Sequence, residues 1–165
     1  MSLPSKLEMR AKRVGLISDT HGLLRPEAIE ALQGSELILH AGDVGKAEIL
    51  NELRKIAPTI AIRGNVDTAP WCSSLKETEI VQTEVATFYL VHNIADLDLN
   101  PSAAGIQIVL FGHSHQPTQY KKDSVLYINP GSAGPRRFNL PISLANLDLT
   151  ETPWAVKFVT LPSSK

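Results

Sequence analysis

The chain has 165 residues, a net charge of −1, 43% apolar residues and 20% charged residues. These values are typical of one globular domain, and they argue against an extended nucleic-acid-binding or acidic-membrane-binding surface. The single cysteine, Cys72, excludes an internal disulfide framework and a thiolate zinc cluster.

No targeting or membrane segment is visible in the sequence. Residues 1–13 lack the apolar core of a signal peptide, and the longest apolar run, 106–111, is about a third of the length of a membrane span. We therefore expect a cytoplasmic protein without a membrane partner. We expect one domain over residues 11–165, preceded by a flexible tail of residues 1–10.

The first half of the chain alternates short apolar runs with helical patterns. Three apolar runs predict buried strands, because each is short and ends at polar or glycine residues. They are 14–17, 37–39 and 59–62. Pro26 opens a predicted helix that ends at Gly34, and apolar residues at helical spacing predict another helix over 49–56. The resulting βαβαβ unit predicts parallel strands joined by right-handed crossovers.

The second half is rich in predicted strands and poor in predicted helices. Seven segments have the apolar or alternating pattern of strands: 79–82, 87–91, 106–111, 120–122, 125–128, 143–149 and 154–161. Asp123-Ser124 separates two of them and predicts a hairpin turn. The whole pattern predicts a mixed α/β domain in which two sheets pack together with helices outside.

Polar side chains gather where the predicted strands end. They are Asp19, His21, Asp43, Asn65, His92, His113 and His115. Residues just past the ends of parallel strands share one crevice, which is where ligands bind. We therefore expect two aspartates, one asparagine and four histidines on one rim of the domain.

This set of side chains is suited to metal ions. Histidine is a common neutral metal ligand, and aspartate and asparagine supply hard oxygen ligands. Seven ligands exceed the need of one tetrahedral zinc and suit two metals that share a bridging carboxylate. Two divalent cations held by two aspartates leave an excess of positive charge, which favours an anion such as a phosphate. Two such metals can generate a hydroxide and stabilise the oxygens of an in-line displacement.

Five short motifs follow one another in a fixed order: Asp19-x-His21, Gly42-Asp43, Gly64-Asn65-x-Asp67, His92 and Gly112-His113-x-His115. Their order resembles that of the calcineurin-like metallophosphoesterases. The length, the missing cap domain and the Asn-Pro-Gly-Ser segment 129–132 resemble the small uncapped bacterial and archaeal phosphodiesterase branch. The resemblance covers residues 13–161.

The resemblance implies a fold, a ligand set and a reaction. The fold is a four-layer α-β-β-α sandwich of two mixed sheets with flanking helices. One metal would be held by Asp19, His21, Asp43 and His115, and the other by Asp43, Asn65, His92 and His113, with Asp43 bridging. The reaction is hydrolysis of a phosphodiester by attack of a hydroxide held between two divalent metals. Manganese is the first expectation, while zinc, iron, nickel and cobalt stay open.

Further residues are assigned to catalysis and substrate binding. We place Asn65 and Asp67 with the catalytic residues; orienting a neighbouring ligand or capping a turn is the alternative role for Asp67. Arg25 and Arg136 are candidates for substrate binding, because an arginine fork matches a pair of phosphate oxygens. The alternative for both is a solvated surface arginine. His40 is expected to support the ligands rather than to bind metal.

Two positions depart from the family pattern. Many larger relatives have histidine after the Gly-Asn pair, where this chain has Val66, which cannot move a proton. This departure favours a phosphodiester, or an ester with a good leaving group, over an ordinary monoester. A nucleotide or another diester stays open as the substrate. Asn93 stands where glycine is usual, and because asparagine tolerates left-handed backbone angles, we expect the loop to survive the change.

Other function classes stay open beside the enzyme. One is a non-catalytic protein-binding scaffold of the kind found in the small retromer subunit, which keeps the fold but has lost part of the ligand set. The other is a broad phosphatase of low activity. The completeness of the seven ligand types favours the enzyme. A homo-oligomer is left open.

Overall fold

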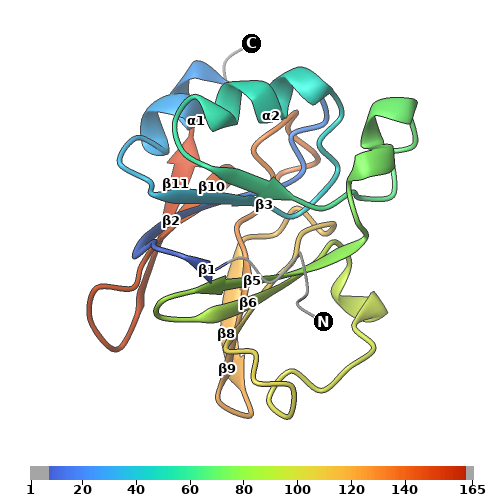
Figure 1. Cartoon of the computed structure of the whole chain (residues 1–165). Helices are drawn as coiled ribbons and strands as arrows, with labels where there is room; N and C mark the ends of the chain where they lie inside the picture. Colours follow the sequence, from blue (N-terminus) through green and yellow to red (C-terminus); the bar gives the residue numbers. More distant parts are fainter. Residues whose placement is uncertain (1–7, 163–165) are drawn as a thin grey trace.

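Two β-sheets packed face to face form the centre of the molecule in a computed structural model that describes residues 8–162 (Figure 1). The first half contains β1 (Glu8–Met9), β2 (Arg13–Ile17), α1 (Pro26–Ala31), β3 (Leu37–His40), α2 (Ala47–Arg54), β4 (Thr59–Ala61) and the 3-10 helix η1 (Pro70–Ser74). The second half contains β5 (Thr78–Thr83), β6 (Thr87–Val91), the 3-10 helix η2 (Ile94–Asp96), β7 (Ile108–Leu110), β8 (Thr118–Lys122), β9 (Val125–Asn129), β10 (Ile142–Asp148) and β11 (Ala155–Leu161).

The five-stranded sheet has the strand order β11-β10-β2-β3-β4. Strands β2, β3 and β4 are parallel, with Val14 beside Leu37 and Ile38 beside Thr59. Strand β10 adds antiparallel to β2, and β11 adds antiparallel to β10. The predicted βαβαβ unit is therefore confirmed, and Figure 1 shows α1 and α2 over the outer face of this sheet.

The six-stranded sheet has the order β1-β5-β6-β7-β9-β8 and is also mixed. Strands β6, β7 and β9 run parallel to one another, β5 pairs antiparallel with β6 and parallel with β1, and β8 pairs antiparallel with β9. Asp123 and Ser124 join β8 to β9 with φ values of 52° and 67°. Two successive left-handed residues are what a tight hairpin turn requires, so the predicted turn is confirmed.

Apolar side chains fill the space between the sheets. Leu16 and Leu39 from one sheet meet Phe88, Leu90 and Ile108 from the other, and all five are fully buried. Burial of one such side chain stabilises the fold by about 1.5–3 kcal/mol. The continuous apolar runs in the sequence form strands that are buried on both faces, as expected for sheets with parallel central strands.

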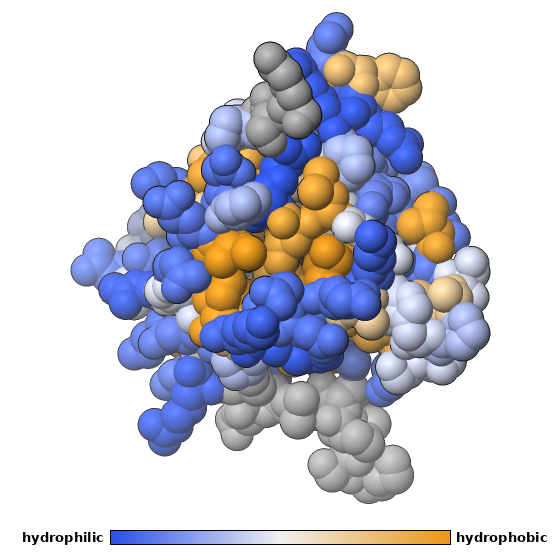
Figure 2. Space-filling model, turned by 90° about the horizontal axis from the view of Figure 1, so that it is seen from above, coloured by the Kyte–Doolittle hydropathy of each residue, from blue (hydrophilic) through white to orange (hydrophobic). Residues whose placement is uncertain are grey.

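The two outer layers differ in character. Helices α1 and α2 bury Ala28, Ile49 and Leu53 against the five-stranded sheet. Seen from above, that helical side shows apolar side chains near its centre with hydrophilic residues around them (Figure 2). The outer face of the six-stranded sheet is covered by η2 and the following loop, whose Ile94 and Leu97 pack against it. The predicted sandwich is confirmed, with a fourth layer reduced to a single 3-10 turn and a loop.

Element boundaries differ from the expected ones in small ways. The first helix ends at Ala31 rather than Gly34, which lies in the following turn with φ +90°. Glu8–Met9 pairs with β5, so ordered structure begins ahead of residue 11; residues 1–7 of the expected tail lie outside the described residues. None of the helices within residues 8–162 has the length and apolar character needed to cross a membrane.

Candidate metal centre

The ends of five strands meet at one edge of the sandwich and bring the predicted polar residues together. Asp19 and His21 follow β2, and Asp43 follows β3. The backbone N–H of Asp19 donates to Gly42 O at 3.0 Å, and that of His21 donates to Asp43 O at 2.9 Å. These bonds hold the first two loops side by side. The loops after β6 and β7 are joined in the same way, by Gly112 N–H donating to His92 O at 2.9 Å.

Five of the seven predicted ligands have left-handed backbone angles. They are Asp19, His21, Asp43, His113 and His115, with φ between 48° and 72°. Such angles cost a non-glycine residue about 1 kcal/mol or more, although aspartate and histidine adopt them more readily than most residues. The conformation turns each chain sharply away from its strand and directs the side chain toward the shared edge.

Each of the two carboxylates has one oxygen held by the protein. Asp19 Oδ2 accepts hydrogen bonds from Ser18 Oγ at 2.5 Å and from His113 N–H at 3.1 Å, so this aspartate connects the two sheets. Asp43 Oδ1 accepts from Val66 N–H at 3.0 Å. The second oxygens, Asp19 Oδ1 and Asp43 Oδ2, face the imidazoles instead.

Three histidine rings surround these two oxygens. His92 Nε2 lies 3.1 Å from Asp43 Oδ2 and 3.8 Å from Asp19 Oδ1. His21 Nε2 lies 3.7 Å from both, and His115 Nε2 lies 3.4 Å from Asp19 Oδ1. Burial raises the pKa of Asp19, but the rings of His115 and His21 outweigh it and hold that pKa well below its ordinary value. The carboxylates therefore stay anionic, which a cation site requires.

Unpartnered buried atoms test whether the site fits metal ions. Asp19 Oδ1, His21 Nε2, His92 Nε2 and His115 Nδ1 are buried without a hydrogen-bond partner. Leaving such atoms unpaired is costly, and a bound cation would satisfy the oxygen and nitrogen lone pairs together. Two sets of three donors lie within 4.8 Å of one another, namely Asp19, His21 and His115, and Asp19, Asp43 and His92. The donor chemistry fits divalent metals that accept nitrogen and oxygen ligands.

The same chain matches the sequence model described as the calcineurin-like phosphoesterase superfamily domain over residues 13–152. The chain belongs to this superfamily. A relative from Methanothermobacter thermautotrophicus, named a "probable metallophosphoesterase", is 32% identical over 131 residues, which cover 72% of this chain and 76% of the relative.

Two solved structures share the fold of this calcineurin-like chain. One is titled as a novel archaeal phosphodiesterase and gives a TM-score of 0.77 at 24% identity, covering 90% of this chain and 99% of that one. The other is Vps29 from Chaetomium thermophilum, with a TM-score of 0.73 at 16% identity, covering 93% and 100% of the two chains. At these identities the likeness concerns the fold.

A second layer of residues in this calcineurin-like site orients the candidate ligands. His92 Nδ1 lies 2.8 Å from Ala41 O and donates to it, which leaves Nε2 as the ring atom directed at Asp43. The hydrogen bond also fixes the plane of the ring. Burial lowers the pKa of His92, but the nearby carboxylates of Asp43 and Asp19 together with the Ala41 carbonyl outweigh burial, so the net pKa is above its ordinary value.

His40 is fully buried and supports the loops, as expected for a residue behind the ligands. Its Nδ1 accepts from Gly42 N–H at 3.1 Å, so the proton of the neutral ring sits on Nε2 and is donated to Thr20 Oγ1 at 3.0 Å. Thr20 in turn donates to Val44 O at 2.8 Å. Burial lowers the pKa of His40 to about 4. The ring is therefore neutral and forms part of a fixed chain of bonds between two loops.

Asp67 holds two loops together and makes no contact with the imidazole cluster among the described residues. Its carboxylate accepts from Val44 N–H and Gly45 N–H, each at 3.0 Å, and from Gly64 N–H at 2.9 Å. Three backbone donors occupy both oxygens. These bonds hold the loops of Asp43 and Asn65 in place, which supports a positioning role for Asp67. Its assignment to the catalytic residues stays a prediction.

The Asn-Pro-Gly-Ser segment lies directly behind the histidine loop. The Asn129 amide donates to Gly112 O and to Ser114 Oγ, both at 3.1 Å. Ser132 Oγ donates to Asp19 O at 3.0 Å. The segment therefore braces the loops that carry Asp19, His113 and His115, which explains why it accompanies them.

Asn65 and His113 lie at the open side of the centre. Both are exposed and line a cavity that begins at the cluster. The His113 ring meets the His92 ring edge to face, with centroids 5.3 Å apart. Val66, beside Asn65, is 47% exposed. The structure thus brings five of the predicted ligands into a tight group and places the remaining two at its rim.

The predicted substrate arginines occupy other positions. Arg25 is buried, and its guanidinium donates to Gly134 O at 3.3 Å, so it tethers the loop after the Asn-Pro-Gly-Ser segment. Arg136 is exposed, and neither arginine lines the cavity. The arginine that does line it is Arg63, next to Gly64 in the sequence. The only sign in the sequence that Arg63 lies near the site is its position directly before the Gly-Asn motif, and we did not predict a role for it.

Asn93 does not adopt the left-handed angles that asparagine tolerates. Its φ is −112°, and its side chain accepts from Ala95 N–H at 3.0 Å, which caps η2. The loop accommodates asparagine here because the local demand is for a residue that caps a 3-10 turn, not for a positive φ.

Proposed function

We propose that this chain is a metal-dependent hydrolase of phosphodiesters that uses two divalent ions. The observation that carries the proposal is the cluster of buried, unpartnered donor atoms around Asp19 and Asp43, next to an open cavity. A family assignment alone would leave the activity open, since one fold hosts many functions. A set of donors that lack any other partner supports metal chemistry at this edge.

The ligand assignment follows the resemblance. We propose Asp19, His21, Asp43 and His115 for the first metal, and Asp43, Asn65, His92 and His113 for the second. The distances of Asp43 Oδ2 to His21 and His92, 3.7 and 3.1 Å, support a bridging position for this carboxylate. When bound, two such ions supply a hydroxide nucleophile and stabilise charge on the phosphoryl oxygens.

The residues of the chain have distinct tasks around that chemistry. Asp67 and His40 hold the loops, and the hydrogen bond of His92 to Ala41 fixes the ring that faces Asp43. Asn65, at the rim, can donate from its amide to a phosphoryl oxygen. Val66 cannot donate a proton to a leaving group, which supports a preference for diesters with good leaving groups over monoesters.

A protein-binding scaffold is the second candidate, since the Vps29 structure has the same fold. A scaffold does not require several buried donor atoms without partners, and such atoms reduce the stability of a protein that binds no ion. A broad phosphatase of low activity is the third candidate, and its substrate range would distinguish it. Manganese as the favoured ion, a cytoplasmic location and the oligomeric state stay predictions.

The direct test is hydrolysis of bis(4-nitrophenyl) phosphate by protein stripped with a chelator and then reloaded with manganese. The stripped protein is the control, and metal analysis of the reloaded protein gives the number of ions bound. Turnover that depends on metal, with two ions per chain, would support the proposal. No turnover with manganese, zinc, nickel or cobalt would refute it and favour the scaffold.

A further inference from the structure

A cavity of about 830 Å³ lies beside the candidate metal centre. Asn65, His92 and His113 form the wall that it shares with the centre. His92 is only 6% exposed, and its Nε2 has no hydrogen-bond partner. An ester whose phosphoryl group sits at the centre therefore has room to extend one of its substituents into this cavity.

Among the other residues that line the cavity, most of the charged ones are acidic. Arg63 and Glu77 both line it and neutralise one another, with Arg63 Nη2 3.5 Å from Glu77 Oε2. Asp96 and Asp98, from η2 and the residues after it, line the cavity as well. Within residues 8–162, no cationic side chain lies within ion-pair distance of either aspartate. Asp96 and Asp98 thus add two negative charges without a cationic partner to the lining of the cavity.

The charges of the two walls differ in sign once metals are bound. The centre would attract the phosphoryl group of the ester, and the aspartate wall would repel any further phosphate on the same molecule. A positively charged substituent would be attracted to the aspartates.

We propose that the cavity selects phosphodiesters in which one substituent is a cationic amine or amino alcohol, by means of Asp96 and Asp98. This inference rests on the proposed function, because it concerns the same site. It argues against nucleic-acid ends and polyphosphate chains as substrates, since both would place a second phosphate in the acidic cavity.

The test compares esters that all release 4-nitrophenol. One carries a choline arm, one a thymidine arm and one a thymidine 3′-phosphate arm, so the arm is cationic, neutral or anionic. With manganese-loaded protein, kcat/KM should decrease in that order, and the cationic ester should exceed the anionic one by roughly tenfold or more. Aminoalkyl arms of different length would locate the aspartates relative to the phosphoryl group.

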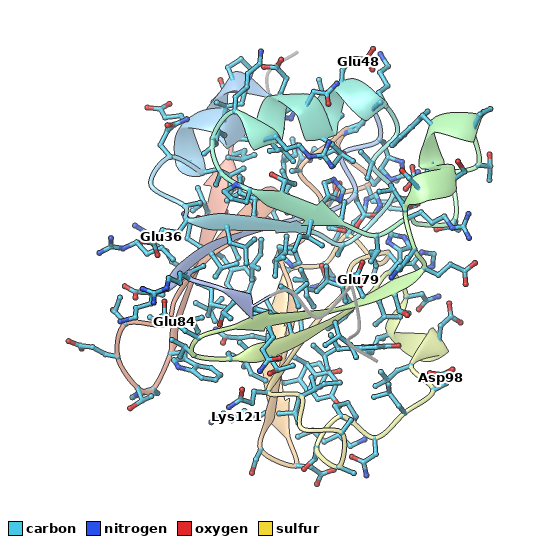
Figure 3. The ribbon with its side chains drawn as sticks, in the orientation of Figure 1. Glu36, Glu48, Glu79, Glu84, Asp98 and Lys121 are labelled. Atoms are coloured by element: carbon cyan, nitrogen blue, oxygen red, sulfur yellow. The ribbon has the colours of Figure 1, made fainter. Side chains whose placement is uncertain are left out.

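The matched variants are Asp96→Asn with Asp98→Asn, and Glu84→Gln as the control. Figure 3 shows Asp98 on the side of the molecule that carries η2 and Glu84 at the opposite side. The double variant should reduce the ratio of cationic to anionic kcat/KM to near one. Glu84→Gln should leave the ratio unchanged, because its carboxylate does not line the cavity.

Calorimetric titration with phosphocholine and with glycerol phosphate gives a readout that does not depend on turnover. Phosphocholine should bind to the metal-loaded protein more tightly than glycerol phosphate does. In the double variant the two ligands should bind with equal affinity. Turnover of the neutral ester without a charge preference, or equal binding of the two ligands, would overturn this inference and leave the phosphodiesterase proposal standing. Absence of turnover with every ester would refute the proposed function, while the titration would still decide the selectivity of the cavity.

Discussion

The candidate metal centre has a buried half and an open half. Asp19, Asp43 and His115 are buried at 0%, 3% and 4% exposure, while Asn65 and His113 are exposed at the mouth of the cavity. The buried half is held by bonds between loops, such as Asp19 N–H to Gly42 O. The open half borders the space where a substrate would enter.

The difference separates two tasks within one site. Donors held by buried hydrogen bonds are already oriented before an ion binds, so little conformational freedom is lost on binding. Exposed donors can adjust as ions and substrate arrive. We therefore expect the buried half to determine metal affinity and the open half to affect turnover and selectivity more strongly. Five predictions test this contrast.

The largest effect is expected from Asp43→Asn. If Asp43 bridges both metals, activity should fall by about a thousandfold or more and both ions should be lost, because an amide cannot replace a bridging carboxylate. Metal content and turnover of bis(4-nitrophenyl) phosphate measure this. Asp19→Asn is the matched variant, since Asp19 Oδ1 also lies near three histidine rings. Loss of both ions in Asp19→Asn and of one ion in Asp43→Asn would identify Asp19 as the bridge.

His115→Ala and His113→Ala compare the two halves directly. The buried His115 should be the more important for affinity, so His115→Ala should weaken metal binding by more than the roughly 10–100-fold typical of losing a residue behind the ligands. His113→Ala should weaken binding less and reduce turnover at saturating metal. Titration with manganese checks both. His40→Ala serves as a control, and an equal loss of affinity in His40→Ala and His115→Ala would contradict the ligand assignment.

The pH dependence of stability should reflect His40. Its pKa is about 4 in the folded chain and 6.5 in the unfolded chain, so the neutral ring stabilises the fold above pH 6.5. That contribution, about 3 kcal/mol, is lost as pH falls from 6.5 toward 4. Urea unfolding of metal-free His40→Gln should show a flatter pH dependence over this window. His113→Gln, which removes an exposed histidine, should keep the slope of the wild-type protein.

Asp67→Asn should separate positioning from catalysis. The carboxylate uses both oxygens to accept from the backbone N–H groups of Val44, Gly45 and Gly64, and asparagine keeps only one acceptor oxygen. At least one of these hydrogen bonds is therefore lost, and the free energy of unfolding should fall by about 2 kcal/mol. Metal binding should weaken because two ligand loops are loosened. Turnover should recover at saturating metal. Turnover that stays low although both ions are bound would show that Asp67 acts in the reaction itself.

The smallest effect is expected from Val66→His. A histidine at this half-exposed position could donate a proton to a leaving group, so the ratio of monoester to diester turnover should rise several-fold. Hydrolysis of 4-nitrophenyl phosphate and its bis ester measures the ratio. Val66→Gln is the control for size and polarity without a group that titrates near neutral pH. An unchanged ratio in Val66→His would remove the explanation given for diester preference.

The sequence predicts the strands and the ends of strands better than it predicts contacts between loops. Short apolar runs specify strands buried on both faces, and polar residues that follow them are placed at the sheet edge by topology alone. The position of Asp43 was therefore predictable. The burial of Arg25 was not, because it depends on a partner, Gly134 O, that is 109 residues away in the chain.

Backbone conformation was the other unpredictable part of the site. The left-handed angles at Asp19 and His21 accompany hydrogen bonds between loops, which have no local sequence pattern. Asn93 shows the reverse case, in which a residue that tolerates left-handed angles keeps a negative φ and caps a short helix. Arg63 was overlooked because its role depends on the cavity that β5, β6 and the loop after β6 enclose.

The hydrogen bond from His113 N–H to Asp19 Oδ2 joins loops that belong to different sheets. Donors on both sheets mean that an ion bound between them would cross-link the two halves of the sandwich. Metal binding and folding are then coupled, so each would report on the other. A core substitution that touches no donor, such as Phe88→Leu between the sheets, should weaken metal binding by shifting one sheet against the other. The packing of the apolar interior should therefore affect the metal affinity of a site that it does not touch.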